Sequence, residues 1–256
     1  MRNAAMDRDT ILQTVSLFVD ARRTGQLLGA LPAFARPASA ADAHAIQEAT
    51  AAALGDAIGG WKVSAPIDGQ LVRGAILRSL IFDSPARVRA ARVPMLGVEA
   101  EIAFSFDRDM PPRGRDYSYA EVAAAVTAFP AIEVVATRFR DYAGTPLLDR
   151  AADFVSNGAF VRGPARRDWR DFDLARIEIA LTVGGKEIVR QTGGHASVDP
   201  LLPAVALVND LRAGAGVQAG QVMTTGTYTG LNFAKPGQTV SAAFTRFGAA
   251  VVEFIA

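Results

Sequence analysis

Hydrophobic and polar positions alternate along residues 97–106, which read Gly-Val-Glu-Ala-Glu-Ile-Ala-Phe-Ser-Phe. Successive side chains of a β-strand leave opposite faces, so the pattern predicts a strand with one apolar face and with Glu99 and Glu101 together on the other. Neighbouring carboxylates repel each other unless a positive charge lies between them, and a hard divalent cation is the usual partner of converging oxygen ligands. The alternative is an ordinary amphipathic surface strand, because charged residues are mostly exposed.

A second run, residues 129–136, is apolar and β-branched apart from Glu133, which is typical of a buried strand. A buried carboxylate is costly unless it has a partner or a metal ion. If this strand lies beside the first, Glu133 completes an all-oxygen ligand set with Glu99 and Glu101 that suits Mg²⁺ or Mn²⁺. The alternative for Glu133 is a partly exposed strand end or an arginine ion pair, for which Arg138 is a candidate.

Helical spacing of apolar residues and capping residues predict most of the remaining elements. A first helix starts at Asp9 or Thr10 and ends at Gly25, and a second runs from Ser39 to Gly55. Further along, the sequence predicts a helix from Ser118 to near Phe129, a hairpin turning at 184–185, and a helix over 201–211. These elements indicate a mixed α/β, β-rich chain with a helical N-terminal portion (1–60) and a β-rich catalytic body (61–256).

Composition narrows the possible partners. The 256 residues are 50% hydrophobic and carry a formal charge of +1, so nothing favours nucleic acid or a membrane surface, and a small molecule is the expected partner. With no cysteine there is no disulfide and no thiolate site, and the N-terminus has no signal-like pattern, so a cytoplasmic location is expected. No glycine loop resembles a nucleotide-binding motif.

Candidate catalytic side chains are few. Lys62 follows two glycines and lies between Trp61 and Val63, either as a strand-edge lysine that reaches water or as a buried group with an altered pKa. The chain has two histidines and no Gly-x-Ser-x-Gly motif, which argues against a hydrolase triad. His44 is expected to be a packing or surface residue of its helix and not a metal ligand, and His195 is expected in a loop.

The segments Gly-Val-Glu-Ala-Glu-Ile-Ala-Phe and Pro-Ala-Ile-Glu-Val-Val resemble the fumarylacetoacetate hydrolase superfamily, and within it the 2-keto-4-pentenoate hydratases and 4-oxalocrotonate decarboxylases. The resemblance extends to residues 60–63, 149–158 and 224–227. It implies a rolled β fold, a homo-oligomer, and a metal ion on the three glutamates. It also implies that Lys62 lies in the active site and that substrate contacts come from a further set of residues: Leu77, Asn157, Gly158, Thr225, Gly226 and Thr227.

The chain departs from the family pattern at three positions. Ser79 stands where hydratases of the family commonly carry an aspartate that activates water, and serine cannot act as a carboxylate base. Phe154 and Asn157 replace a typical asparagine and a typical serine, which implies an altered substrate contact. Asp149 and Asp153 lie one helical turn apart in the segment that the resemblance places beside the substrate. The alternative is a structural role for both, as helix caps or ion-pair partners.

The sequence therefore predicts a metal-dependent lyase acting on small 2-oxo or 2-hydroxydienoic acids through an enolate, as a hydratase or a decarboxylase. With serine at position 79, decarboxylation is favoured over hydration. Two alternatives stay open: a carbon–carbon hydrolase of the acylpyruvate type, for which His195 is the histidine to watch, and a non-catalytic family member.

Overall fold

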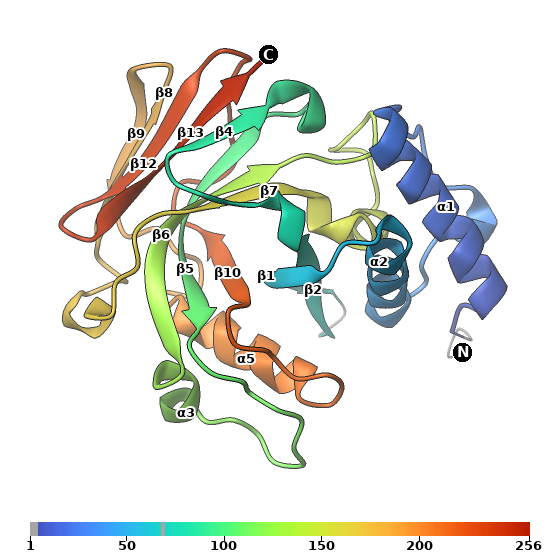
Figure 1. The fold of residues 1–256 in the computed structure, drawn as a ribbon, viewed down its shortest axis with the longest axis horizontal. Helices are drawn as coiled ribbons and strands as arrows, with labels where there is room; N and C mark the ends of the chain where they lie inside the picture. The colour runs from blue at the N-terminus through green and yellow to red at the C-terminus, as the bar shows by residue number, and fades with distance from the viewer. Residues whose placement is uncertain (1–4, 68–69) are drawn as a thin grey trace.

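The computed structural model describes residues 5–67 and 70–256 and has a mixed α/β, β-rich fold with helices at its N-terminus (Figure 1). The α-helices are α1 (Arg8–Thr24), α2 (Ala40–Leu54), α3 (Tyr119–Ala123), α4 (Leu147–Ala152) and α5 (Leu201–Leu211). The strands are β1 (Ile58–Ile67), β2 (Gln70–Leu77), β3 (Ile81–Asp83), β4 (Ala86–Arg89), β5 (Gly97–Phe106), β6 (Val126–Val135), β7 (Asn157–Arg162), β8 (Glu178–Val183), β9 (Lys186–Thr192), β10 (Val222–Thr227), β11 (Asn232–Phe233), β12 (Thr239–Phe244) and β13 (Gly248–Ile255).

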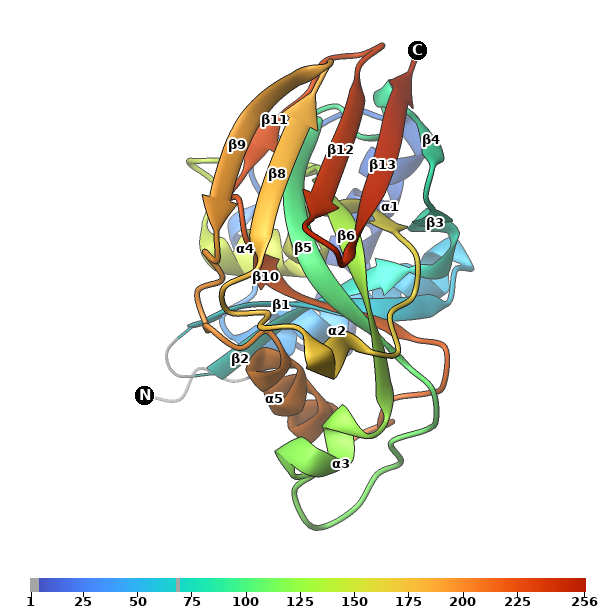
Figure 2. The ribbon, with the colours of Figure 1, turned by 90° about the vertical axis from the view of Figure 1, so that its left-hand side faces the viewer.

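The strands form two sheets. The larger one has the order β2-β1-β10-β5-β6-β7-β3, with β11 beside β5, and the smaller one has the order β4-β13-β12-β8-β9. Figure 2 shows the smaller sheet fanned in front of the long, curved strands β5 and β6. The main hydrophobic core lies between the sheets, and it includes Phe104 of β5 and Phe254 of β13, both fully buried.

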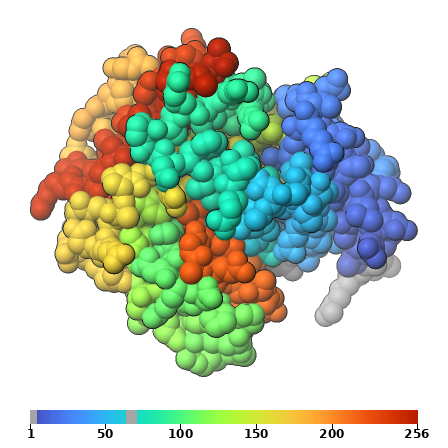
Figure 3. All heavy atoms as spheres, viewed as in Figure 1, coloured from blue at the N-terminus to red at the C-terminus, as the bar shows by residue number. Residues whose placement is uncertain are grey.

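Helix α2 is capped as the sequence predicts, whereas α1 begins earlier than the predicted cap at Asp9 or Thr10. Asp7 caps α1 through the backbone N–H of Thr10, and Ser39 caps α2 through that of Asp42. Both helices end at a glycine in the left-handed conformation, Gly25 and Gly55. Figures 1 and 3 show α1 and α2 together at one side of the molecule. A separate core cluster fixes them against residues of β2 and α4, so they pack on the sheet that carries the candidate site.

The central pair of strands aligns the acidic residues. β5 and β6 are antiparallel, with Glu99 opposite Glu133 and Glu101 opposite Ala131. Most of β5 and all of β6 are buried, so the amphipathic surface strand considered above does not form. Instead, both strands are covered on both faces, and their glutamates project into the interior of the fold.

The predicted hairpin at 184–185 and helix 201–211 are both confirmed, as β8–β9 and α5. The predicted helix 118–129 is wrong in its second half, because α3 ends at Ala123 and β6 begins at Val126. Its alanines favour a helix, but Val126 pairs with Phe106, and the ladder to β5 overrides local propensity. The division at residue 60 stays a prediction. No helix in the described parts of the chain is long and apolar enough to cross a membrane.

Candidate metal centre and active site

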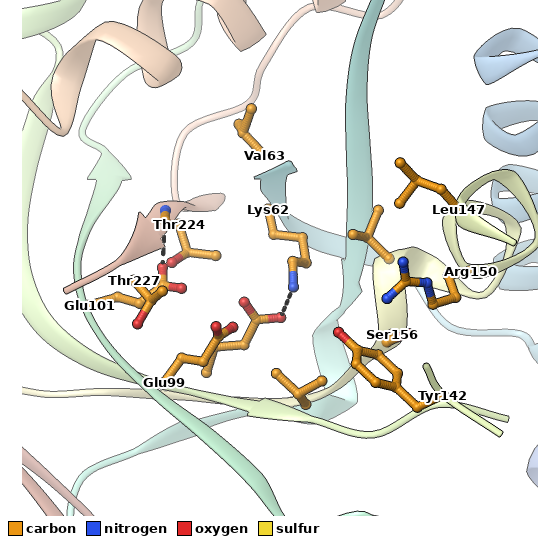
Figure 4. Close-up of a pocket in the computed structure, with 14 residues that line it drawn as sticks. Lys62, Val63, Glu99, Glu101, Tyr142, Leu147, Arg150, Ser156, Thr224 and Thr227 are labelled. Atoms are coloured by element: carbon orange, nitrogen blue, oxygen red, sulfur yellow. Dashed lines mark hydrogen bonds and ion pairs between the residues drawn. The ribbon is translucent and has the colours of Figure 1, made fainter. Parts of the chain in front are cut away.

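A cavity of about 350 Å³ opens beside β1, β5, β6 and β10 (Figure 4). Four strands bring polar groups to it: β5 and β6 carry the glutamates, β1 carries the lysine, and β10 ends in the Thr-Gly-Thr turn. The opposite wall comes from the segment 142–156. The whole cavity is lined by Lys62, Val63, Glu99, Glu101, Glu133, Val135, Tyr142, Leu147, Arg150, Val155, Ser156, Thr224, Gly226 and Thr227.

The three glutamates converge as the sequence predicts. One carboxylate oxygen from each of Glu99, Glu101 and Glu133 lies within 4.8 Å of the others. Glu101 and Glu133 are buried, at 2% and 1% exposure, and Glu99 is partly exposed. The ion pair considered between Glu133 and Arg138 is absent among the described residues, and Glu133 pairs with Lys62 instead.

Burial and mutual repulsion disfavour ionisation of the carboxyl groups. Burial raises the pKa of Glu99 to about 7, with the Lys62 ammonium opposing the shift and Glu133 adding to it. Burial also raises the pKa of Glu101 well above its usual range, and the charges of Glu133 and Glu99 add to that shift. The cluster is therefore short of positive charge, which is the condition in which a bound cation stabilises a site.

Lys62 lies at the centre of this cavity. Its Nζ is 2.6 Å from Glu133 Oε1, and its side chain is 11% exposed. Burial alone would lower the pKa of Lys62, but attraction to Glu133 and Glu99 outweighs it and raises the net pKa, so the side chain is an ammonium. In β1, Lys62 stands beside Thr224 of β10, and this parallel pairing aims both residues at the glutamates.

The Thr-Gly-Thr turn contributes backbone and hydroxyl groups to the cavity. The N–H of Gly226 donates to Glu101 Oε2 at 3.4 Å, and Thr227 stands opposite Glu101 in the ladder. Gly226 has φ +123°, a conformation that side chains rarely adopt. Thr224 Oγ1 is buried without a hydrogen-bond partner among the described residues. The predicted residues Gly226 and Thr227 thus line the cavity, while Thr225 lies behind it.

His195 supports this turn from behind and does not line the cavity. Its Nε2 lies 3.0 Å from the carbonyl oxygen of Thr225, and its Nδ1 accepts from the N–H of Ser197 at 3.2 Å. The ring therefore carries its proton on Nε2, and it packs against Tyr228 with 5.3 Å between ring centroids. Burial lowers the pKa of His195, which keeps it neutral. His44 packs as predicted, with its Nε2 accepting from the N–H of Arg73.

Arg150 and Tyr142 form the wall across the cavity from Glu101 and Thr227 (Figure 4). The Arg150 guanidinium lies 4.8 Å from the centroid of the Tyr142 ring, and its Nε is buried without a partner in the described part of the chain. The sequence analysis missed both residues. Arg150 could have been recognised, because it is a basic residue beside Asp149 in the segment that the resemblance places near the substrate. Tyr142 lies in a loop for which the sequence offered no such signal.

The segment that leads into β7 is strained next to the cavity. Phe154, Val155 and Ser156 have φ values of 55°, 51° and 58°, and each such residue costs about 1–2 kcal/mol. Val155 and Ser156 line the cavity, whereas Phe154 is buried away from it. Asn157 Nδ2 donates to Glu133 Oε1 at 3.0 Å, so the altered residue at this position contacts a predicted metal ligand. Such strain clusters at functional sites.

Besides Asn157 and Thr225, three further predicted site residues do not line this cavity. Ser79 is exposed in a short 3₁₀ helix after β2, where its N–H and hydroxyl bond the Asp56 carboxylate. Leu77 and Gly158 line the same separate cleft as Ser79. Position 79 does not face the glutamate cavity, because the chain turns out of the sheet directly after Leu77. Asp149 and Asp153 pair with Arg36 and Arg22, as their structural alternative predicts.

The side chains present fit a divalent metal ion. The donor set is three carboxylates, which hard cations prefer, and the three lie close enough to share one ion. Three carboxylates against one ammonium leave two negative charges uncompensated when all groups are ionised. The unpartnered Thr224 Oγ1 adds a neutral oxygen at the same place. Glu99, Glu101 and Glu133 are the residues that would hold the ion.

The chain is similar in sequence and in fold to several known proteins. The chain is 29% identical over 187 residues to a 2-keto-4-pentenoate hydratase of Paraburkholderia phymatum, covering 73% of this chain and 71% of that one. It is 30% identical over 183 residues to the Burkholderia vietnamiensis hydratase, covering 71% and 69%. The fold matches that of a 4-oxalocrotonate decarboxylase from Pseudomonas putida G7, complexed with magnesium and adipate, with a TM-score of 0.84 at 21% identity over 99% and 100% of the two chains.

A more distant fold match is fumarylpyruvate hydrolase from Pseudomonas aeruginosa, in complex with Mn²⁺ and pyruvate, with a TM-score of 0.54 at 16% identity over 76% of this chain and 88% of that one. The rolled β fold implied by the sequence resemblance is thereby confirmed. The family model for the fumarylacetoacetate (FAA) hydrolase C-terminal region matches residues 77–254. Because that match spans more than half of the chain, the protein belongs to the fumarylacetoacetate hydrolase family.

Proposed function

We propose that this protein is a metal-dependent lyase acting on small 2-oxo or 2-hydroxydienoic acids. The observation that carries the proposal is the convergence of three largely buried glutamates, Lys62 and the Thr-Gly-Thr turn on one cavity. The relatives that align with 73% and 71% of this chain, at 29% and 30% identity, are 2-keto-4-pentenoate hydratases. Their names support the same class of substrate for this protein. A bound Mg²⁺ or Mn²⁺ would supply positive charge to stabilise the enolate of a 2-oxo acid.

The chain's own residues would bind and orient the acid. Gly226 and Thr227 offer a backbone N–H and a hydroxyl to the substrate carboxylate next to the glutamates. The Lys62 ammonium reaches the centre of the cavity, where it donates a hydrogen bond to developing negative charge on oxygen. The hydroxyl of Thr224, which has no hydrogen-bond partner among the described residues, is a third donor at this end of the cavity.

Arg150 supports a substrate with a second acidic group. It is a cation on the wall opposite the Thr-Gly-Thr turn, its Nε has no partner in the described chain, and Tyr142 fixes the guanidinium plane. A guanidinium in this position recognises a carboxylate through charge-assisted hydrogen bonds. We therefore expect an unsaturated 2-oxo dicarboxylic acid to be preferred to a monocarboxylic one.

The same arginine bears on the reaction. Pairing with Arg150 stabilises the far carboxylate as a charged ground state, which raises the barrier to losing that group as CO₂. Hydration keeps the carboxylate, so Arg150 favours water addition over decarboxylation. The opposite preference drawn from Ser79 depends on that residue facing substrate, and Ser79 lies in another cleft.

The two alternative functions receive less support. A carbon–carbon hydrolase needs a base for water, and His195 is occupied by the Thr225 carbonyl and lies outside the cavity. A non-catalytic family member has no need of a buried cluster of like charges, which is costly to maintain.

The proposal is tested by a turnover screen over 2-hydroxydienoates, unsaturated 2-oxo dicarboxylic acids and acylpyruvates, with Mg²⁺, Mn²⁺ or EDTA. We expect metal-dependent loss of dienol absorbance with a 4-hydroxy-2-oxo acid as product. Glu133→Gln should abolish it, whereas Glu253→Gln, at a half-exposed position outside the cavity, serves as the matched control. Products of carbon–carbon cleavage would favour the hydrolase, and no turnover by a protein that binds metal would favour the non-catalytic alternative.

A further inference from the structure

A second cleft of about 670 Å³ separates the N-terminal helices from the body of the protein. In Figure 3 it is the hollow between the blue α1 and the teal segment that follows β4. It lies apart from the glutamate cavity, and the two share no lining residue. Its charged lining is mainly basic, with four arginines, Arg22, Arg23, Arg92 and Arg138, which we call the arginine cleft.

Two of these arginines are buried and incompletely bonded. The Arg22 side chain is 8% exposed and Arg138 is 7% exposed. Each has a buried Nε with no hydrogen-bond partner among the residues described. Unsatisfied buried donors are costly, and guanidinium groups that approach each other repel, so this arrangement calls for a ligand that accepts hydrogen bonds and carries negative charge.

The protein supplies too little negative charge to balance the arginine cleft. Asp153 pairs with Arg22 at 2.8 Å, and its other oxygen accepts from the backbone N–H of Arg138. The Arg138 guanidinium itself bonds only a carbonyl oxygen, that of Ala136, within the described chain. Asp56 is the one carboxylate that lines the cleft, and it already accepts from Ser79.

Helix capping accounts for only part of this basic lining. Helices α1 and α2 both end here, and arginines interact favourably with helix C-termini. Arg23 fits that role, because its guanidinium reaches the carbonyl of Ala53 at 3.4 Å. Arg92 and Arg138 come from the 3₁₀ helix after β4 and from the loop after β6, and they contact neither helix end by hydrogen bonds within the described chain.

We propose that the arginine cleft binds a small, multiply charged oxyanion, such as inorganic phosphate or a dicarboxylate. Planar guanidinium groups bind both kinds of oxyanion through paired hydrogen bonds, and a dianion can bridge the buried Arg138 and the exposed Arg92. The site is distinct from the candidate metal centre. It is connected to that centre through the strained turn, since Arg22 stacks 4.4 Å from the centroid of the Phe154 ring and Val155 lines the other cavity.

The test is calorimetric titration of the full-length, metal-free protein with inorganic phosphate at constant ionic strength, with succinate in a parallel titration. We expect one saturable site, weakened at least 10-fold in Arg138→Met and a few-fold in Arg92→Gln. Arg89→Gln removes an exposed arginine outside the cleft and should bind as the unmodified protein does. If Arg138→Met folds poorly, the double variant Arg23→Gln/Arg92→Gln carries the test, because both side chains are exposed.

Three outcomes would overturn the proposal. One is no saturable binding of phosphate or succinate. Another is binding that is lost in Arg150→Met and kept in Arg138→Met, which would assign the ligand to the glutamate cavity. The third is a fall in oligomer mass on adding phosphate, measured by light scattering, which would mean that a carboxylate from a second copy of the chain fills the cleft. Tighter binding of phosphate than succinate, or the reverse, identifies the preferred oxyanion and supports the site.

Discussion

The glutamate cavity and the arginine cleft are opposites in charge. The first brings three carboxylates and a single ammonium together, and the second brings four guanidinium groups against one lining carboxylate. Elsewhere, charged groups of opposite sign form ion pairs, as Arg113 does with Glu121. Uncompensated buried charge is expensive, so the buried glutamates of the first site fit a cation and the buried Arg138 of the second fits an anion.

One segment lies between the two sites. Asp153 is fully buried and bonds Arg22 on the side of the arginine cleft. The left-handed residues that follow place Val155 and Ser156 in the glutamate cavity. This turn contacts both sites, so a ligand in either one bears on the same residues. The comparison can therefore be tested by removing charge from each site in turn.

The largest effect is expected from Lys62→Met. The methionine keeps the packing of the stem but leaves Glu133 buried without its ion-pair partner, at a cost of about 3 kcal/mol in the metal-free protein. Added Mg²⁺ should restore most of that stability, because it replaces the lost positive charge. Turnover should fall by about 10²–10³ even with metal, through loss of a donor to the enolate.

Urea unfolding in EDTA and in Mg²⁺ measures the first effect, and steady-state kinetics measures the second. Lys235→Met is the matched control, since Lys235 is exposed and lines neither site. Equal stability of Lys62→Met and the unmodified protein in EDTA would mean that the glutamates do not need a cation, and the contrast between the two sites would fail.

The next effect is expected from Arg150→Met. Removing a charge-assisted hydrogen bond of about 1.5–3 kcal/mol should lower kcat/KM for a dicarboxylic 2-oxo acid about 10- to 100-fold. A monocarboxylic analogue should lose little, because its far end carries no charge. Arg140→Met, at an exposed position outside the cavity, should change neither substrate. A uniform loss across both substrates would show that Arg150 supports the fold and does not select the substrate.

A smaller effect is expected from the titration of Glu99. Its folded pKa is raised by burial to about 7, above the ordinary 4.5, so the stability it contributes is present below pH 4.5 and is lost as pH rises through about 7. Metal-free Glu99→Gln should therefore unfold at a higher temperature than the unmodified protein at pH 8, and at a similar temperature at pH 4. Metal binding needs the carboxylate, so Mg²⁺ should stabilise the unmodified protein more at pH 8 than at pH 6 and stabilise the glutamine variant little.

Thermal melts in EDTA and Mg²⁺ at three pH values measure this effect. Glu253→Gln, at a half-exposed position outside both sites, should melt as the unmodified protein does under every condition. A Glu99→Gln variant that is less stable than the unmodified protein at pH 8 without metal would contradict the raised pKa.

Capping residues and the alternation of apolar and polar residues were sufficient to predict α2 and β5. Ser39 and Gly55 set the ends of α2, and the alternation around Glu99 identified β5. The sequence could not establish that β5 and β6 are neighbours, so the three-glutamate site was predicted only if they pair. Their register brings together residues 34 positions apart, such as Glu99 and Glu133, and no local signal reports it. The second half of the predicted helix 118–129 failed for the same reason, since the ladder to β5 decides it.

The candidate site divides in the same way. Glu133 was recognisable because a charge in an apolar strand is conspicuous, and Lys62 because the resemblance named its motif. Arg150 reaches the cavity from the short helix α4, and Tyr142 reaches it from a loop. The direction of both segments depends on tertiary packing. Ser79 was misplaced because the strand that ends at Leu77 was read as continuing, although a 3₁₀ turn follows it at once.

The smallest effect is expected from Ser79→Asp, and it separates the two sites most directly. A carboxylate base acting on water is typically worth about 10²–10⁴ in rate, so an aspartate in the glutamate cavity would raise hydration of 2-hydroxypenta-2,4-dienoate strongly. Ser79 instead lines the arginine cleft beside Asp56. Hydration by Ser79→Asp should therefore stay within about twofold of the unmodified protein, while the new negative charge weakens phosphate binding a few-fold. Ser79→Ala is the control and should change neither measurement. A tenfold gain in hydration would place residue 79 at the substrate after all, and the two cavities would then have to be treated as one site.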